Sequence, residues 1–233
     1  MTDVISYRLD DGVAVITIDD GKANAVSHAL LAELNAALDR AEAEARAVVI
    51  VGRDGKFSAG FDLAAMTASA ESMRALVIEG AHLLMRLYGL GLPTVAACTG
   101  HALAAGALFL LACDERIGAE GNAKIGLNEV AIGMALPIFA VEMARDRLVK
   151  GQFGPATMGA RIYDPAGAVL AGYLDEVVPP EAVVETALAA GHRLAALRTG
   201  AYARTKQTAR AAGIAEILAT LEADMAEISP PSA

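Results

Sequence analysis

The sequence has few cysteines, no long apolar run and a deficit of positive charge, and each shortage excludes a class of protein. Its two cysteines, Cys98 and Cys113, suit small core residues of a protein kept in a reducing compartment. The longest apolar run covers residues 102–113, whereas a membrane-spanning helix needs about 20 apolar residues. We therefore expect no membrane partner. The first residues lack a signal-peptide pattern, which predicts a cytoplasmic location.

The charge balance argues against a nucleic-acid partner. The chain carries 28 acidic residues against 19 lysines and arginines, a formal net charge of −9. Binding to a phosphate backbone depends on basic patches, and here such patches would act against the overall field. With 233 residues, 55% of them hydrophobic, the chain is long enough for one domain with a substantial core.

Several catalytic and metal-binding motifs are also missing. Cys98 and His101 form a C-x-x-H pair, but no second ligand pair follows at the spacing of a zinc site, so we expect no metal. No G-x-S-x-G elbow occurs, because Lys56 stands where the first glycine belongs. The chain has no P-loop, no G-x-G-x-x-G and no H-E-x-x-H. A protease, an NTPase and a dehydrogenase are therefore disfavoured.

Apolar strands alternate with amphipathic helices along most of the chain, which predicts an α/β protein. A hairpin is expected where "VISYRL" and "VAVITI" flank the turn "DDG". Ser27 is a plausible cap for the first helix. The loop "RDGKFSAGFDL" leads to the second helix. Beyond the hairpin we expect helices at 27–45, 71–90 and 104–113 and strands at 47–52, 93–100, 115–120 and 123–127.

The chain changes character near residue 179. From there to residue 228 no convincing strand occurs, and the pattern predicts two or three consecutive helices. We therefore divide the chain into a core at 1–178, a helical C-terminal subdomain at 179–228 and a disordered tail at 229–233. Apolar residues on more than one face of these helices predict a homo-oligomer (Val183, Leu188, Leu194, Leu197, Ile214, Ile217 and Leu221).

Two junctions between a loop and a helix carry small residues. They are "FSAGFDL" at 57–63 and "TGHALAAGALFLLACD" at 99–114. Small side chains let a ligand approach the backbone, and free N–H groups at the start of a helix attract developing negative charge. Two such groups aimed at one oxygen would form an oxyanion hole. The alternative is that the small residues only permit tight helix packing.

These segments resemble the crotonase superfamily, the enoyl-CoA hydratase and isomerase proteins. "KFSAGFDLAAM" is followed about 40 residues later by "GHALAAGALFLLACDERIG", as in that superfamily. "DGKANAVSHALLAELNAAL" resembles its N-terminal motif, and "AGYLDEVVPPEAVV" resembles a later segment. The resemblance covers nearly the whole chain. It departs from the common pattern in having "LAAG" where many members have a run of glycines.

The resemblance implies a spiral of ββα turns with C-terminal helices that build homotrimers or hexamers, and acyl-CoA thioesters as ligands. Coenzyme A is then part of the substrate, so no cofactor is implied. The thioester oxygen would rest between the N–H groups of Phe61 and Ala105. The substrate-binding groove would include Lys22 and Ala23 of the N-terminal motif and the backbone of Ala59, Gly60, Asp62 and Leu63. Asp62 is also a candidate helix cap.

The glutamates separate the possible reactions. Hydratases of this superfamily use two, one of which lies three residues after the second oxyanion N–H; here that residue is Leu108. The other glutamate aligns with Glu129 in "GLNE". Adding water to a 2-enoyl thioester needs a water that is held and deprotonated, whereas moving a double bond needs one proton shuttle. "FSAGFDLAAM", the leucine at 108 and "IGLNE" together resemble mitochondrial-type Δ3,Δ2-enoyl-CoA isomerases of fatty-acid metabolism. Apolar neighbours such as Val130, Ile132 and Leu127 are expected to raise the pKa of Glu129.

Two alternatives stay open. The chain could be a hydratase with an unusual second group, or a non-catalytic acyl-CoA binding protein. Glu129 tells against the second, because a binder needs no carboxylate beside the reacting carbons. Glu79 on the second helix could be a second acid, or it could lie on a solvated helix face.

Overall fold

The computed structural model describes residues 4–230, and the expected tail at 229–233 lies partly outside this range. The strands are β1 (Ile5–Asp10), β2 (Val13–Ile18), β3 (Ala47–Val51), β4 (Gly55–Ser58), β5 (Thr94–Cys98), β6 (Gly100–Leu103), β7 (Glu115–Ala119), β8 (Ile125–Gly126) and β9 (Glu176–Val178). The helices are α1 (His28–Glu44), α2 (Leu63–Ala68), α3 (Ala70–Gly89), α4 (Ala105–Ala112), α5 (Ile138–Arg147), α6 (Phe153–Ala156), α7 (Pro165–Ala171), α8 (Val183–Ala195) and α9 (Thr199–Glu227), with 3-10 turns η1 (Val130–Ile132), η2 (Lys150–Gln152) and η3 (Pro180–Ala182).

The strands form two sheets that the chain visits in turn. The larger sheet has the order β1-β2-β3-β5-β7-β9, antiparallel only between β1 and β2, and the smaller parallel sheet has the order β4-β6-β8. The first turn gives both β1 and β2 to the large sheet before α1 follows. In each of the next three turns one strand joins the large sheet and the next joins the small sheet before a helix follows. This repeated ββα spiral confirms the α/β fold predicted from the sequence.

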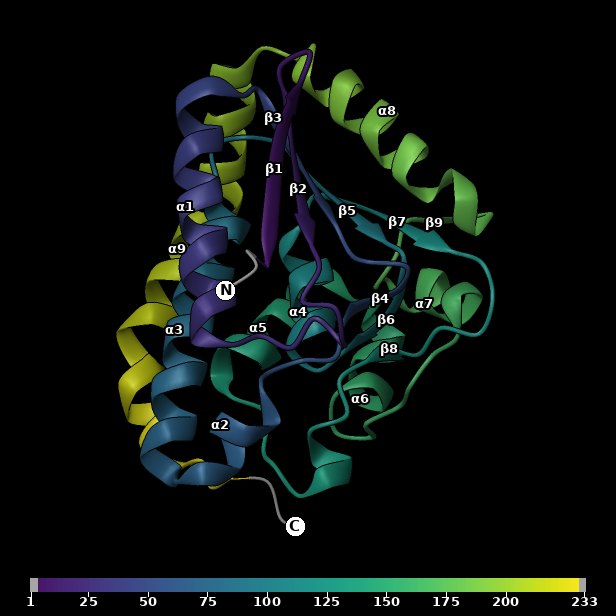
Figure 1. The fold of residues 1–233 in the computed structure, drawn as a ribbon. Coiled ribbons are helices and arrows are strands. Elements are labelled where there is room, and N and C mark those ends of the chain that lie inside the picture. Colours follow the sequence, from purple (N-terminus) through teal and green to yellow (C-terminus); the bar gives the residue numbers. More distant parts are fainter. Residues whose placement is uncertain (1–3, 231–233) are drawn as a thin grey trace.

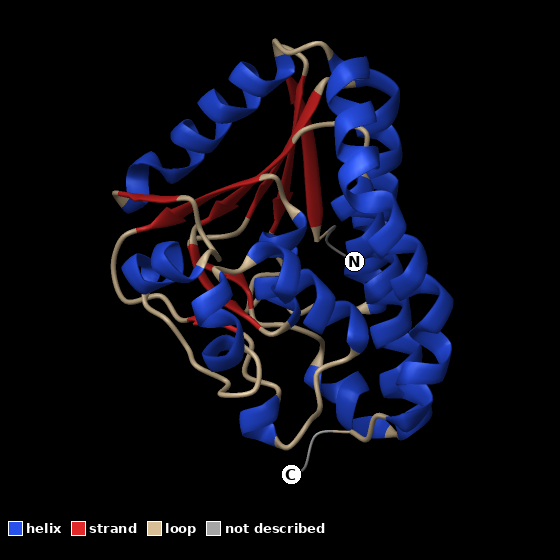
Figure 2. Ribbon diagram, turned by 180° about the vertical axis from the view of Figure 1, so that it is seen from behind, coloured by secondary structure: helices blue, strands red, loops and turns tan. Residues whose placement is uncertain are grey.

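Both faces of the large sheet are buried. Successive side chains of a strand point to opposite faces, so all five residues of β3 are apolar and fully enclosed. On one face Val49, Val95 and Ile117 pack with Val183 and Leu194 of α8. The remaining helices cover the other face and the small sheet. Figures 1 and 2 show α8 alone on its side of the large sheet, with α1, α3 and α9 stacked on the opposite side.

The C-terminal helices are two, as expected, and both pack on their own chain. α8 packs on β3, β5 and β7, while α9 packs on α3 and α5. The apolar faces of these helices therefore no longer support the predicted homo-oligomer. Of the apolar residues on which it rested, Val183, Leu194, Ile217 and Leu221 are buried inside the single chain, and Leu188 and Ile214 pack against its cores; Leu197 is 47% exposed.

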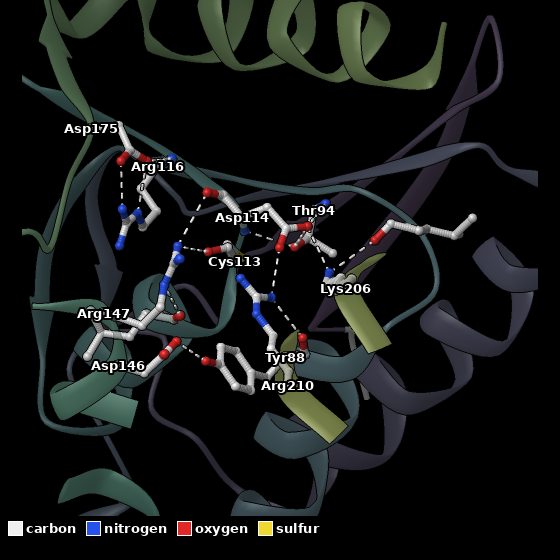
Figure 3. Close-up of polar contacts among 12 residues, drawn as sticks. Tyr88, Thr94, Cys113, Asp114, Arg116, Asp146, Arg147, Asp175, Lys206 and Arg210 are labelled. Carbon is white, nitrogen blue, oxygen red and sulfur yellow. Dashed lines mark hydrogen bonds and ion pairs between the residues drawn. The ribbon is translucent and has the colours of Figure 1, made fainter. Parts of the chain in front are cut away.

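A buried ion cluster fixes α9 to the end of α4. Asp114 follows α4 and accepts hydrogen bonds from Lys206 at 2.7 Å and from Arg210 at 2.8 Å, both on α9 (Figure 3). It also accepts from the backbone and hydroxyl of Thr94. Burial alone would raise the pKa of Asp114, but the charges of Lys206 and Arg210 outweigh it and hold the pKa below its usual range.

Arg147 holds the same end of α4 from α5. Its guanidinium donates to the carbonyl oxygens of Leu111 at 3.1 Å and Cys113 at 2.8 Å (Figure 3). These carbonyls belong to the last turn of α4, where a positive charge interacts favourably with the helix dipole. Because this end of α4 is fixed, its first turn is held in place at the other end.

Some short elements differ from the sequence prediction. The segment expected as a loop at 53–63 contains β4. The strand expected at 93–100 ends at Cys98, and a separate strand, β6, runs from Gly100 to Leu103; β9 at 176–178 was not expected. All three are short and carry glycine or charged residues, so they show no clear alternation. Within residues 4–230 no helix combines the length and apolar character needed to cross a membrane.

Candidate active site

An apolar cavity of about 470 Å³ opens between the small sheet and helices α2 to α5. Its walls come from residues far apart in the sequence, including most of the predicted site. The polar side chains among them belong to Asp62, Asn128 and Glu129. The lining residues are Ala23, Ala25, Ala59, Phe61, Asp62, Leu63, Ala64, Met66, Val77, Ala104, Leu108, Asn128, Glu129, Ile132, Met134, Pro137, Phe139 and Ala140.

The loop after β4 is held by backbone pairing with residues 23–26. Ala59 donates to the Ala23 carbonyl at 3.0 Å, Val26 donates to Gly60 at 2.8 Å, and Asp62 donates to Val26 at 3.0 Å. This pairing occupies the N–H groups of Ala59 and Asp62, while the Gly60 N–H donates to the Ser58 hydroxyl at 3.3 Å. The Phe61 N–H itself has no hydrogen-bond partner within residues 4–230, so it is available to a ligand.

Asn24 is the centre of that pairing, and the sequence analysis missed it. It is fully buried in a left-handed conformation (φ 52°), and its side-chain amide donates to Ile18 at 2.8 Å and Phe57 at 3.1 Å. The Ser58 hydroxyl donates to the Asn24 carbonyl at 2.8 Å. Asp20 in turn accepts from the backbone of residues 22, 24 and 25. The spacing of Asp20 and Asn24 around a glycine is a turn signal that could have indicated this role.

The second loop ends at the start of α4. Ala104 adopts a strained backbone conformation (φ 50°, ψ −122°), and its carbonyl accepts from the N–H groups of Ala107 and Leu108. The N–H groups of Ala105 and Gly106 come first in the helix and have no partner in the described part of the chain. Free donors at a helix start favour a negatively charged oxygen.

The two loops touch through glycines that no larger residue could replace. A Cβ on Gly60, where φ is +95°, would lie 2.8 Å from the Ala104 Cβ and 3.4 Å from the Ala105 nitrogen. A Cβ on Gly106 would lie 2.3 Å from the Ser58 carbonyl oxygen. The free N–H groups of Phe61 and Ala105 thus come from two segments in direct contact. Such a pair can stabilise an oxyanion.

Glu129 lies at the start of η1, beside this pair of loops. Its side chain lines the cavity, the residue is only 8% exposed, and Oε2 is buried without a partner among residues 4–230. Burial raises the pKa of Glu129 to about 7, although the backbone N–H groups of Glu129 and Asn128 oppose the shift. A carboxyl group that is half protonated near neutral pH can both take and return a proton.

The apolar surroundings of Glu129 come partly from its neighbours in sequence. Of the three neighbours expected to raise its pKa, Leu127 is fully buried and Ile132 lines the cavity although it is 41% exposed, whereas Val130 is 44% exposed and is not among the lining residues. The buried apolar groups that share the cavity with Glu129 are Leu108, Met134, Phe139 and Ala140.

The cavity brings together Ala23, Ala59, Phe61, Asp62, Leu63, Leu108 and Glu129 of the predicted site. Gly60 and Ala105 are buried, touch each other through their backbones and are not among the lining residues. Lys22 is exposed at its edge, where its carbonyl accepts from Arg53 at 2.6 Å. Asp62 caps α2 as expected, accepting from the Ala65 N–H at 2.9 Å. Glu79 pairs with His28 outside the cavity.

The profile of the enoyl-CoA hydratase/isomerase family matches residues 8–228. This chain belongs to that family. The human protein enoyl-CoA delta isomerase 1, mitochondrial, is 32% identical over 92% of this chain and 72% of its own length.

Solved structures of the family superpose closely on this chain. An enoyl-CoA hydratase/isomerase family protein from Pseudomonas syringae has a TM-score of 0.94 and 42% identity, covering 97% of this chain and 98% of that one. A Mycobacterium tuberculosis protein described as an enoyl-CoA isomerase has a TM-score of 0.92 and 39% identity, covering 97% and 100%. A second structure of that mycobacterial protein is described as a probable enoyl-CoA hydratase. Family membership thus leaves the choice between the two reactions to the site.

The contact between the loops predicts that Gly106→Ala displaces one of them. The new methyl group would collide with the Ser58 backbone, so we expect a loss of stability of about 1–3 kcal/mol and a larger loss of activity. Gly213→Ala in α9 is the matched control, because nothing lies within 4 Å of its Cβ and alanine favours a helix. Urea unfolding and steady-state rates would test both. A Gly106→Ala protein as active and stable as wild type would show that the loops do not depend on this contact.

Proposed function

We propose that this protein is an acyl-CoA-processing isomerase that converts 3-enoyl-CoA to 2-enoyl-CoA with Glu129 as its single acid/base. The observation that carries the proposal is that Glu129 and Leu108 line one cavity. A second acid three residues after Ala105 would face this cavity, but position 108 is a leucine, 2% exposed. The other carboxylate of the cavity, Asp62, caps α2.

The reaction follows from these positions. Ionised Glu129 takes a proton from C2 of the substrate, and the electron pair left behind spreads over a dienolate. The negative charge gathers on the thioester oxygen, which the N–H groups of Phe61 and Ala105 hold. Protonated Glu129 then returns the proton to C4, which leaves the double bond between C2 and C3. A pKa of about 7 makes both transfers accessible near neutral pH.

The apolar walls support isomerisation over hydration. Leu108 can neither hold nor deprotonate a water. Phe139 and Met134 are also buried around the same cavity and exclude competing water from the dienolate. The cavity accommodates an acyl chain, which has no polar group to satisfy beyond its thioester.

A second cavity adjoins the first and suits the coenzyme A tail. It has a volume of about 300 Å³ and shares Ala23 and Ala59 with the acyl cavity. Its other walls include Lys56, His101 and Lys124, so cationic side chains lie along the path on which the nucleotide phosphates would rest. Lys22 adds a further exposed cation next to Ala23.

The first test separates binding from chemistry. Glu129→Gln should keep its affinity for an acyl-CoA nearly unchanged, because the thioester and nucleotide contacts lie elsewhere, while isomerisation of 3-hexenoyl-CoA falls by orders of magnitude. In wild type, kcat/KM should rise with pH through about 7 as the carboxylate form of Glu129 accumulates. Glu79→Gln removes a carboxylate that pairs with His28 and should leave the rate unchanged. Equal losses of affinity and rate in Glu129→Gln would indicate a structural role for Glu129.

The second test addresses the hydratase alternative. Leu108→Glu should place a second carboxyl group in the cavity with Glu129, so hydration of crotonyl-CoA should rise above the wild-type rate while isomerisation falls. The gain is expected to be small, because a carboxyl group in an apolar site stays partly protonated. Leu108→Gln, which admits water without adding an acid, is the control. Wild-type hydration with a kcat of about 10 per second or more would favour the hydratase instead.

We also propose that the protein is a homotrimer or a hexamer, as the resemblance implies. Exposed apolar side chains around α6 and α7 support an interface there: Val149, Met158, Ile162 and Leu170, of which Leu170 is 76% exposed. Light scattering should give a mass that is a multiple of three chains, and Leu170→Lys should lower it. A 23.9 kDa monomer in solution would contradict the assembly. The cytoplasmic location stays a prediction.

A further inference from the structure

Gly80 stands in the interior of α3, and the proposed mechanism gives it no role. The helix has 20 residues, from Ala70 to Gly89, and Gly80 is buried near its middle. Glycine is among the least favourable residues for a helix interior. Close packing of another group against the helix backbone is a physical reason to have a glycine there.

The group that packs against Gly80 is the ring of Phe61. A Cβ at Gly80 would lie 2.4 Å from Cε1 and 2.6 Å from Cζ of Phe61, and the third-nearest atom would be Cδ1 of the same ring at 3.7 Å. All three neighbours belong to one ring, which occupies the space that a side chain at position 80 would need. Phe61 thus rests its ring on α3, while its N–H is one of the two proposed oxyanion donors.

Both backbones at this contact are held in place. The segment of α3 around Gly80 is packed into the main hydrophobic core. The backbone of Phe61 pairs with Val26, whose N–H donates to Gly60 at 2.8 Å and whose carbonyl accepts from Asp62 at 3.0 Å. A methyl group at position 80 would therefore displace the ring, by rotation about its side-chain torsions, before it moved either backbone.

The acyl cavity offers the space into which the ring can turn. Phe61 lines this cavity, and so does Val77, which lies three residues before Gly80 on the same face of α3. The cavity has a volume of about 470 Å³. The core side chains of α3 are closely packed and leave no comparable room for a ring. A ring driven away from Gly80 would therefore take volume from the cavity.

We propose that Gly80 determines the length of the acyl chain that the cavity accepts, because it lets the Phe61 ring pack on α3 and out of the cavity. This rests on the proposed function as an acyl-CoA-processing enzyme. Gly80 acts through Phe61 and touches no reacting atom. Its effect should therefore appear in the binding of acyl-CoAs that cannot react.

The test compares Gly80→Ala with Gly89→Ala, a matched control in the same helix. A Cβ at Gly89 would lie 3.0 Å from Cδ1 of Ile214, the end of a side chain that does not line the cavity. Calorimetry would give affinities for saturated acyl-CoAs from butyryl to dodecanoyl, which can neither isomerise nor add water. Phe61→Ala, alone and combined with Gly80→Ala, shows whether the effect depends on the ring.

Each methylene group that enters the cavity should raise the affinity about fourfold. In Gly80→Ala this gain should stop about two methylenes earlier than in wild type, so the affinity for the longest chains falls about tenfold. Butyryl-CoA should bind both proteins equally, and the Gly89→Ala series should follow wild type. When Phe61 is alanine, adding Gly80→Ala should leave all affinities unchanged.

A second readout locates the ring without a ligand. In Gly80→Ala the Phe61 ring should gain NOEs to methyl groups that line the acyl cavity, with Phe61→Ala identifying the ring signals. If Gly80→Ala does not fold, Phe61→Trp overfills the same space beside an unchanged helix. It should then shorten the accepted chain in the same way.

Three results would overturn the proposal: affinities in Gly80→Ala that follow wild type, a loss that is equal at every chain length, or a loss that persists without the Phe61 ring. A wild-type protein that binds none of these acyl-CoAs would instead contradict the proposed function. In that case the NOEs still decide the structural step, because an unmoved ring in Gly80→Ala would overturn it.

Discussion

The contact of Gly60 with the first turn of α4 is the constraint on which the candidate site depends. Two segments separated by some 40 residues can present their N–H groups to one oxygen only if their backbones touch, and any side chain at Gly60 or Gly106 would separate them. The rest of the chain holds this contact from both sides. Residues 23–26 pair with the loop around Gly60. The cluster at Asp114, with Arg147, fixes the far end of α4. Donors that are fixed in advance need no reorganisation when charge develops.

The burial that forms the cavity also raises the pKa of Glu129. Removing a carboxylate from water destabilises the charged form, and among the described residues, 4–230, no basic group compensates for this at Glu129. In a residue with no functional role, burying the carboxylate would only lower the stability of the fold. Here it places the pKa in the range where a proton can be taken and returned, and Leu108 keeps a second acid from competing for the same space. The apolar wall and the raised pKa of the proposed acid/base are therefore two results of the same burial.

The sequence predicted what is local or strongly periodic. The hairpin, the long helices and the buried strands follow from alternation and amphipathic spacing, and Ser27 and Asp62 cap the helices that they precede. The strands β4, β6 and β9 were missed because pairing with distant strands, rather than local propensity, stabilises them. Glu129 was predicted through the resemblance. Of the apolar neighbours expected around it, Leu127 is buried and Ile132 lines the cavity, whereas Val130 is exposed. Asn24 was missed because the loop that it supports, through Phe57 and Ser58, lies far away in the sequence, although its turn with Asp20 is local.

The net charge of the chain and the charges that line the second cavity have opposite signs. A net charge of −9 repels an anionic ligand at long range, and a coenzyme A thioester carries several phosphates. At physiological ionic strength, however, exposed charges are largely screened beyond about 8 Å. In the binding mode proposed above, a phosphate beside Ala59 would lie within that distance of Lys56 and Lys124, which line the second cavity. The two lysines would then outweigh the net charge at short range. An acidic protein can in this way accept an anionic substrate on one face while the rest of its surface disfavours polyanions such as nucleic acids.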